Sequence, residues 1–204
     1  AHSGSCRERF RLASPCRPYT MPDICRWICK EETLMDLIVT AAGNGWQARH
    51  GDRSWRAAVG RGGIRVEKAE GDGVSPVGRW PIRAVYYRAD RIGKPASPFP
   101  TKVIAELDGW CDDPAHADYN RPVTRPFPAS HEEMWRQDDL YDIVVVLGHN
   151  DDPPVPGAGS AIFLHIARPD YAPTEGCAAL AKEDLLVFLA DAQPGTHLEF
   201  RASA

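Results

Sequence analysis

The residues best suited to covalent chemistry lie in the last quarter of the chain, where His165 is followed by Thr174-Glu175-Gly176-Cys177. A free cysteine has a pKa of about 8.5, and a neighbouring imidazole or a helix start increases the fraction that is thiolate at neutral pH. A glycine beside the thiol lets a substrate carbonyl approach, and it lets the N–H groups of Gly176 and Cys177 converge on a developing oxyanion. The pattern predicts an acyl-transfer site in which Cys177 is the nucleophile and His165 its base.

The same residues also have a purely structural interpretation, which the sequence leaves open. A buried free cysteine is common in protein cores, and a histidine at the end of a strand is often a hydrogen-bonded core residue. The seven histidines never form a His-Glu-x-x-His spacing and no Gly-x-Ser-x-Gly occurs, so neither a zincin nor a serine hydrolase is indicated. His149 stands beside Asn150 and Asp151, but the prolines that follow favour a turn. We expect no metal and no cofactor.

Short strands separated by turns are expected to position these residues. Between residues 35 and 88, apolar-rich runs alternate with glycine-containing turns, as in a β-meander. Further along, 142–147 and 161–166 are almost continuously apolar, which is typical of buried central strands, and the second run carries His165. The runs of the meander are 37–40, 46–49, 54–59 and 80–87.

One helix and one long excursion complete the expected elements. The segment 182–192 predicts a helix, because apolar residues recur at i, i+3, i+4 and i+7 from Leu185. A final strand is expected over 196–201. The proline-rich stretch 89–128 predicts a long ordered excursion, because its aromatic side chains are expected to pack onto the domain. The fold class is therefore mainly β, a sandwich or open barrel with one helix packed near Cys177.

The strand pattern begins at Met35, so we assign residues 35–204 to one folded domain and residues 1–34 to an N-terminal extension. This extension lacks the apolar core of roughly 7–15 residues that a secretory signal requires. We interpret it as a disordered, processed or artificially added segment. It holds four of the six cysteines, without zinc-finger spacing: Cys6, Cys16, Cys25 and Cys29.

Composition and charge exclude several classes of protein. The 204 residues carry a net charge of −4 with 43% hydrophobic residues, which indicates a globular domain, and no apolar run approaches the roughly 18 residues of a membrane span. The stretch from Glu106 to Asp184 has sixteen acidic and five basic residues, which argues against a nucleic-acid partner. This acidity is either a solvated surface or an aid in attracting a cationic amine substrate. We expect a monomer.

His165 and Thr174-Glu175-Gly176-Cys177 resemble the active-site motif of the L,D-transpeptidases (the YkuD-type family), in which a His and a loop precede Ser/Thr-His-Gly-Cys. The segment 71–80 is similar to the glycine-rich stretch before a core strand of that family. The resemblance implies that Cys177 forms a thioester with one peptidoglycan stem peptide and that an amine of a second stem completes a cross-link. It also implies a backbone carbonyl that orients His165, acylation by carbapenems and a location in the bacterial periplasm.

The resemblance is incomplete around the substrate. Glu175 stands where the family usually has a histidine, and Ala178-Ala179 stands where Arg or Asn is common. Glu175 is either a neutral surface substitution or a residue that selects the acceptor amine, and its position favours the second interpretation. Alternatives with the same chemistry are a cysteine amidase or endopeptidase and an L,D-carboxypeptidase, and the alternative of another class is an inactive peptidoglycan-binding relative. The further candidates for substrate binding are Thr174, Arg168, Asn120 and Arg121.

Overall fold

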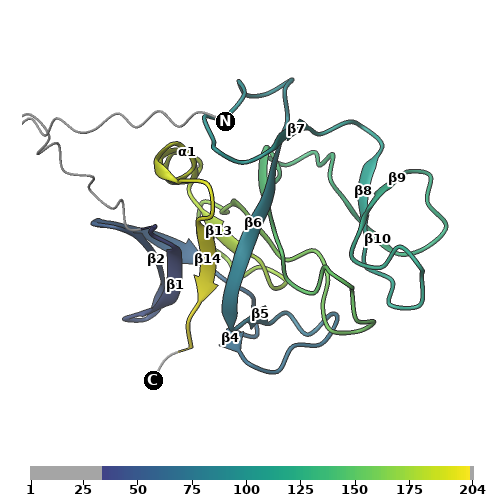
Figure 1. The fold of residues 1–204 in the computed structure, drawn as a ribbon, viewed down its shortest axis with the longest axis horizontal. Helices are drawn as coiled ribbons and strands as arrows, with labels where there is room; N and C mark the ends of the chain where they lie inside the picture. Colours follow the sequence, from purple (N-terminus) through teal and green to yellow (C-terminus); the bar gives the residue numbers. More distant parts are fainter. Residues whose placement is uncertain (1–33, 203–204) are drawn as a thin grey trace, which may run out of the picture. The chain divides into compact units, whose positions relative to one another are not determined.

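A computed structural model describes residues 34–202 of the chain, and residues 1–33 and 203–204 lie outside the described residues. The predicted extension over 1–34, with its four cysteines, therefore falls almost entirely outside them. Short strands dominate the described part, which has a single helix (Figure 1). The prediction of a mainly β fold with one helix is confirmed.

Eight strands pair edge to edge in a closed ring, so they form a barrel-like sheet. The pairing of β11 with β6 closes the ring, and β7 (Thr101–Val103) adds an extra strand beside β6. The sheet is thus closed, where the sequence left a sandwich or an open barrel as alternatives. In ring order the strands are β1 (Leu37–Ala42), β2 (Gly45–His50), β3 (Arg53–Ala58), β13 (Ala178–Leu180), β12 (Phe163–Ile166), β11 (Ile143–Leu147), β6 (Gly78–Tyr87) and β14 (His197–Phe200).

The hydrophobic core explains why these segments form strands. β11 and β12 are buried along their whole length, as their continuous apolar runs predict, whereas β1 buries Leu37 and Val39 on one face only. Helix α1 (Lys182–Asp191) packs onto the barrel through Leu185, Phe188 and Leu189. Of the helices in the described residues, none is long and apolar enough to cross a membrane.

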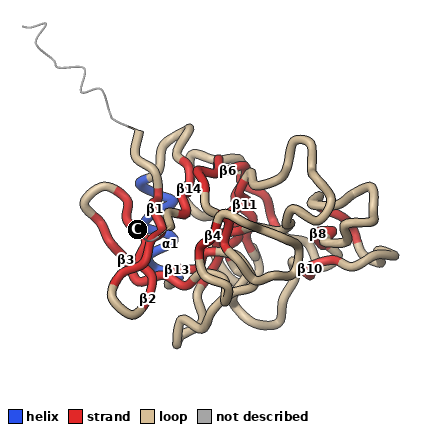
Figure 2. Tube along the Cα trace, turned by 90° about the horizontal axis from the view of Figure 1, so that it is seen from below, coloured by secondary structure: helices blue, strands red, loops and turns tan. Residues whose placement is uncertain are grey.

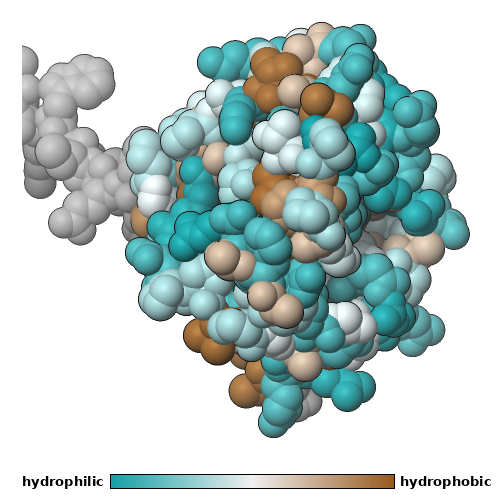
Figure 3. All heavy atoms as spheres, turned by 90° about the vertical axis from the view of Figure 1, so that its right-hand side faces the viewer, coloured by the Kyte–Doolittle hydropathy of each residue, from teal (hydrophilic) through white to brown (hydrophobic). Residues whose placement is uncertain are grey.

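A small three-stranded sheet lies beside the barrel; the proline-rich excursion over 89–128 supplies two of its strands, and the third follows just after the excursion. Its strands are β8 (Asp108–Cys111), β9 (Pro122–Thr124) and β10 (His131–Glu133), in the order β10-β8-β9, and both ribbon views place them at one side of the molecule (Figures 1 and 2). Trp110 and Met134 pack against Phe163 of the barrel in a second apolar cluster. The surface over this side is mostly hydrophilic, with small separate apolar patches (Figure 3). The excursion is packed, as predicted, but its short strands were not expected.

The connection that follows Cys177 differs from expectation. The sequence predicts a helix over 182–192 and no strand before it, yet β13 lies between Cys177 and α1, which begins at Lys182 as predicted. β13 pairs in parallel with β12 and antiparallel with β3, so the pairing of the ring overrides the helical preference of two alanines. Cys177 therefore receives no support from a helix N-terminus. A further pair of strands, β4 (Ile64–Arg65) and β5 (Ser75–Pro76), lies in the glycine-rich region.

Candidate active site

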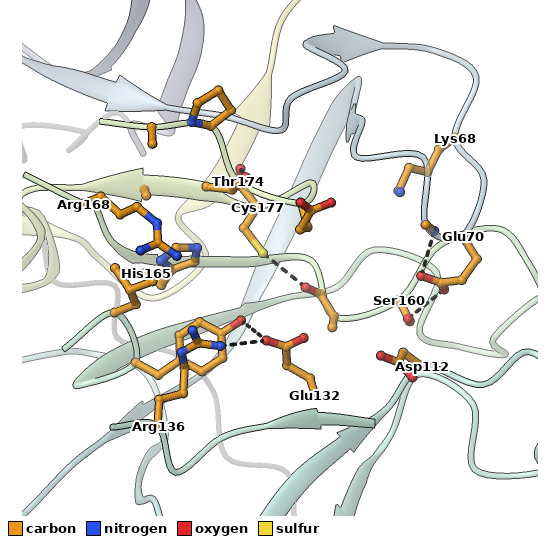
Figure 4. Close-up of a pocket in the computed structure, with 18 residues that line it drawn as sticks. Lys68, Glu70, Asp112, Glu132, Arg136, Ser160, His165, Arg168, Thr174 and Cys177 are labelled. Atoms are coloured by element: carbon orange, nitrogen blue, oxygen red, sulfur yellow. Dashed lines mark hydrogen bonds and ion pairs between the residues drawn. The ribbon is translucent and has the colours of Figure 1, made fainter. Parts of the chain in front are cut away.

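A cavity of about 390 Å³ lies beside β12, and both Cys177 and His165 line it (Figure 4). Strand pairing brings them together. β12 and β13 run parallel with His165 opposite Ala179, so Cys177, two residues before Ala179, projects from the same face of the sheet. Ala179 also lines the cavity, and its small side chain leaves room beside the imidazole.

The thiol of Cys177 is held by the backbone of the neighbouring strand. Its side chain is 7% exposed; Sγ donates to the carbonyl of Ala161 at 3.3 Å and accepts from the N–H of Phe163 at 3.4 Å. Burial raises the pKa of the Cys177 thiol to about 12, and the N–H of Phe163 only partly offsets this. Within residues 34–202 no hydrogen bond joins Sγ to the imidazole of His165. The resting side chain is thus a neutral thiol.

The ring of His165 is buried and fixed in one tautomer. Nδ1 lies 2.9 Å from the carbonyl oxygen of Ile166, which can only accept, so Nδ1 carries the hydrogen and Nε2 keeps a lone pair. Burial lowers the pKa of His165 to about 4, against the opposing effect of this hydrogen bond. The imidazole is therefore neutral at ordinary pH. The orienting group is a backbone carbonyl, as the family resemblance implies.

Hydrogen bonds from the glycine-rich segment hold the loop that carries Cys177. Ser75, a fully buried residue, donates from Oγ to the carbonyl of Gly176 at 2.8 Å and accepts from the N–H of Gly60 at 3.0 Å. Thr174 Oγ1 donates to the carbonyl of Cys177 at 2.7 Å and accepts from the N–H of Gly176 at 3.2 Å. The two sequence segments that carry the resemblance thus meet in space. The N–H of Gly176, predicted for an oxyanion, is already donated to Thr174.

Gly176 is required by its backbone conformation and by its surroundings. Its φ is +134°, a region that residues with a side chain rarely adopt. A Cβ at this position would lie 3.0 Å from the carbonyl oxygen of Val74. The glycine therefore allows the loop before Cys177 to approach the glycine-rich segment closely.

Glu175 lies at the rim of the cavity and is largely exposed. Its carboxylate forms an ion pair with Arg61, whose guanidinium also donates to the carbonyl of Gly71. The N–H of Arg61 donates in turn to the carbonyl of Thr174 at 2.8 Å. Glu175 thus ties the Cys177 loop to the glycine-rich segment, and this contact competes with the predicted role of selecting an amine.

One wall of the cavity combines an aromatic ring with charged groups. The Tyr141 ring lies edge-on to the imidazole of His165, with centroids 5.3 Å apart. Its hydroxyl donates to Glu132 at 2.9 Å, and Arg136 lies 3.5 Å from the same carboxylate oxygen. Burial raises the pKa of Glu132 and raises that of the Tyr141 hydroxyl well above its ordinary value.

The opposite wall comes from residues 68–71, at and just before the start of the glycine-rich segment 71–80. Glu70 accepts hydrogen bonds from the hydroxyls of Tyr119 and Ser160, which joins this region to the excursion and to the segment before β12. Lys68 pairs with Asp72 at 2.6 Å and also lines the cavity (Figure 4). Three separate segments of the chain therefore enclose the space in front of the thiol.

Comparison with known proteins follows this geometry. The family profile described as the L,D-transpeptidase catalytic domain, YkuD, matches residues 38–199. The chain belongs to the YkuD family. Among solved structures, this YkuD domain is similar to L,D-transpeptidase 1 of Mycobacterium tuberculosis, with 11% sequence identity and a TM-score of 0.38. The match covers 83% of this chain and 62% of that one, and no curated protein matches the chain.

The candidate substrate-binding residues of this YkuD domain separate into two groups. Arg168, Thr174 and Glu175 line the cavity, whereas Asn120 and Arg121 are not among its lining residues. Asn120 is buried, and its amide serves the fold: Oδ1 accepts from Trp110 and from the N–H of Ala161, and Nδ2 donates to two carbonyls. Arg121 is exposed on the excursion. A substrate-binding role for these two residues stays a prediction.

Sequence reasoning missed the two walls of the YkuD site. Glu132 and Tyr141 reach the cavity through the pairing of the excursion strands and of β11 with β12, which hydropathy does not specify. Ser75 lies inside the glycine-rich segment 71–80, but nothing in the sequence distinguishes its hydroxyl from that of any other serine. In the described part of the chain, no cluster of three or more His, Cys, Asp or Glu side chains could hold a metal.

Proposed function

We propose that this YkuD domain is a peptidoglycan L,D-transpeptidase in which Cys177 attacks a stem-peptide carbonyl and His165 accepts the thiol proton. The observation that supports this best is the orientation of the imidazole. Its Nδ1 hydrogen is held by Ile166, so Nε2 is the atom free to take a proton in the cavity that the thiol also lines. Membership of the YkuD family gives the substrate class.

The two groups react from their neutral forms. With a pKa of about 12 for Cys177 and about 4 for His165, a thiolate–imidazolium pair is unfavourable before substrate binds. The proton therefore passes from Sγ to Nε2 while the carbonyl carbon is attacked, a general-base step. For this transfer the thiol hydrogen must turn from the carbonyl of Ala161, its acceptor at rest, toward Nε2 of His165.

The steps after the attack follow from the same groups. The N–H of Cys177 is the main-chain donor that we assign to the oxyanion, a contact worth about 3 kcal/mol in comparable sites. The donor amine leaves with the proton from His165, and a thioester remains on Cys177. An amine of a second stem attacks this thioester to form the cross-link, and the released sulfur regains a proton.

Arg168 is the residue that we assign to a carboxylate of the donor stem. It is exposed and lines the cavity, and its charge acts on the ring of His165. Of the two arginines that the sequence offers for substrate binding, Arg168 lines the cavity and Arg121 does not, so we assign this role to Arg168. Since the substrate lies outside the cytoplasmic membrane, we further propose an extracytoplasmic location and residues 35–204 as the catalytic domain.

Defined muropeptides mixed with the protein and analysed by mass spectrometry test this function. A transpeptidase gives cross-linked dimers, and Cys177→Ala gives none. Shortened stems without dimers would identify the hydrolytic alternatives, in which water replaces the second amine. The buried thiol favours an inactive binding relative, and muropeptides that stay unchanged while binding the protein would identify that class.

A further inference from the structure

Glu132 is a carboxylate of the cavity to which the steps above give no role. It lies on β10 and lines the same cavity as Cys177 and His165 (Figure 4). The contacts that fix it, from the Tyr141 hydroxyl and from Arg136, are both made to Oε1. In the described structure Oε2 is thus the oxygen left for a ligand.

Asp112 is a second carboxylate of the same wall, and part of it is unpaired. β8 and β10 are antiparallel with Trp110 opposite Glu132, so Asp112, two residues beyond Trp110, lies on the same face as Glu132. Its Oδ1 is inaccessible to solvent and has no hydrogen-bond partner within residues 34–202. Asp112 also lines the cavity, so its negative charge acts on a ligand that is bound there.

The second step of the proposed reaction, in which an amine attacks the thioester, needs an anionic group in this cavity. A lysine-type amine has a pKa of about 10.4, so it arrives as an ammonium ion and must lose a proton before it can attack. The imidazole of His165 is required for the thiol proton, and its low pKa makes it a poor partner for a cation. The wall that carries Glu132 and Asp112 has two carboxylates and one cation, Arg136, which pairs with Glu132. One net negative charge therefore remains on this wall.

We propose that Glu132 and Asp112 form the subsite for the cationic acceptor amine, an inference that rests on the proposed function. The ammonium donates to Glu132 Oε2 and lies within the field of the Asp112 carboxylate. One proton passes to Glu132 and from there to solvent, and the neutral nitrogen attacks the thioester carbon. The C–N bond forms as the C–S bond breaks, and the second proton moves through His165 to the sulfur of Cys177.

A partition experiment with two acceptors tests this subsite. The protein is acylated with a donor stem peptide and offered either Nα-acetyl-lysine, whose side-chain amine is cationic, or hydroxylamine, which is uncharged at neutral pH. In Glu132→Gln, transfer to Nα-acetyl-lysine relative to hydroxylamine should fall at least about tenfold, the loss expected for a charge-assisted hydrogen bond. The rate of acylation of Cys177 is measured in the same variant, and transfer to Nα-acetyl-lysine should fall by more than acylation does, although the charge of Glu132 also acts on the thiol.

Two further variants complete the experiment. Asp112→Asn should shift the same ratio in the same direction, and its unpaired Oδ1 makes a loss of folding unexpected. Glu133→Gln is the matched control, since Glu133 is the next residue on β10, is exposed and pairs with Arg125. An unchanged ratio in both Glu132→Gln and Asp112→Asn, or equal losses of acylation and transfer in Glu132→Gln, would overturn the amine subsite. A wild-type protein that is never acylated would instead overturn the proposed function, and the subsite with it.

Discussion

At the scale of single residues, the distinctive property of the site is a neutral thiol beside a neutral imidazole. Burial acts on both groups: it raises the pKa of Cys177 and lowers the pKa of His165. Many reactive cysteines are instead thiolates at rest. We therefore expect this thiol to react slowly with simple alkylating reagents and to become nucleophilic only when a bound substrate completes the site.

The pH dependence of acylation tests this neutral pair. Below about pH 4 the ring of His165 is protonated and cannot accept a proton, so the acylation rate should fall as the pH drops through its pKa. Above the pKa of His165 the acylation rate should stay constant through the mildly alkaline range, because the thiol of Cys177 ionises only near its own pKa of about 12. Rates of adduct formation with a carbapenem, followed by intact mass from acid to alkaline pH, measure this. A second fall in rate on the mildly alkaline side would indicate a thiolate–imidazolium pair instead.

At the scale of elements, the site depends on a parallel pair of strands and on one buried hydroxyl. The pairing of β12 with β13 sets His165 and Cys177 on one face, and Ser75 fastens the loop before β13 to the glycine-rich segment. The loop and this segment are about a hundred residues apart in sequence, so these contacts determine their relative position.

Ser75→Ala tests that dependence. The substitution leaves the N–H of Gly60 and the carbonyl of Gly176 without a partner in the interior, which should lower the free energy of unfolding by about 1–3 kcal/mol. Acylation of Cys177 should slow about tenfold or more, because the loop loses its support. Urea unfolding and adduct formation measure the two effects. Ser54→Ala, at an exposed position of β3, is the control, and equal stability of the two variants would contradict this role.

At the scale of the whole molecule, a small sheet beside the barrel completes the cavity. Asn120 is the residue that joins the two parts: its side chain bonds Trp110 in the excursion and the backbone at Ala161, whose carbonyl accepts the thiol hydrogen bond. The excursion therefore supports the same segment of chain that holds Cys177.

Asn120→Ala tests this junction. Four hydrogen bonds, two buried and two part-buried, are lost, so we expect the free energy of unfolding to drop by about 2–4 kcal/mol and the rate of acylation to fall with it. Gln137→Ala, at an exposed amide of the same excursion side, should leave both unchanged. Thermal unfolding together with adduct formation gives the comparison. A stable variant with normal acylation would show that the excursion is not coupled to the site.

Sequence alone predicted the elements whose patterns are local. Alternating or continuous apolar residues located β1, β2, β3, β6, β11, β12, β14 and the helix. The sequence patterns did not predict β13 or the strands of the excursion, because each has only three or four residues and is stabilised mainly by pairing with neighbouring strands.

The same limit applies to the candidate site. The motif placed Cys177 and His165 together, because a strand, a loop and a second strand bring them onto one face. The sequence did not indicate that Asn120 is held in four hydrogen bonds or that Glu132 reaches the cavity, because their positions depend on pairings between segments far apart in the chain. The register between such segments is determined by tertiary packing, so it cannot be predicted from the sequence of either segment alone.

The central claim is that a single thiol carries the acyl group, and intact mass spectrometry with peptide mapping tests it most directly. After exposure to a donor stem peptide, the wild-type protein should gain one acyl mass on Cys177. Cys177→Ala should gain none, and His165→Ala should be acylated at least about a hundredfold more slowly. Cys111→Ala, which removes the other free cysteine of the described residues, should behave as wild type. An unchanged wild-type mass, or an adduct that maps to a residue other than Cys177, would contradict the claim.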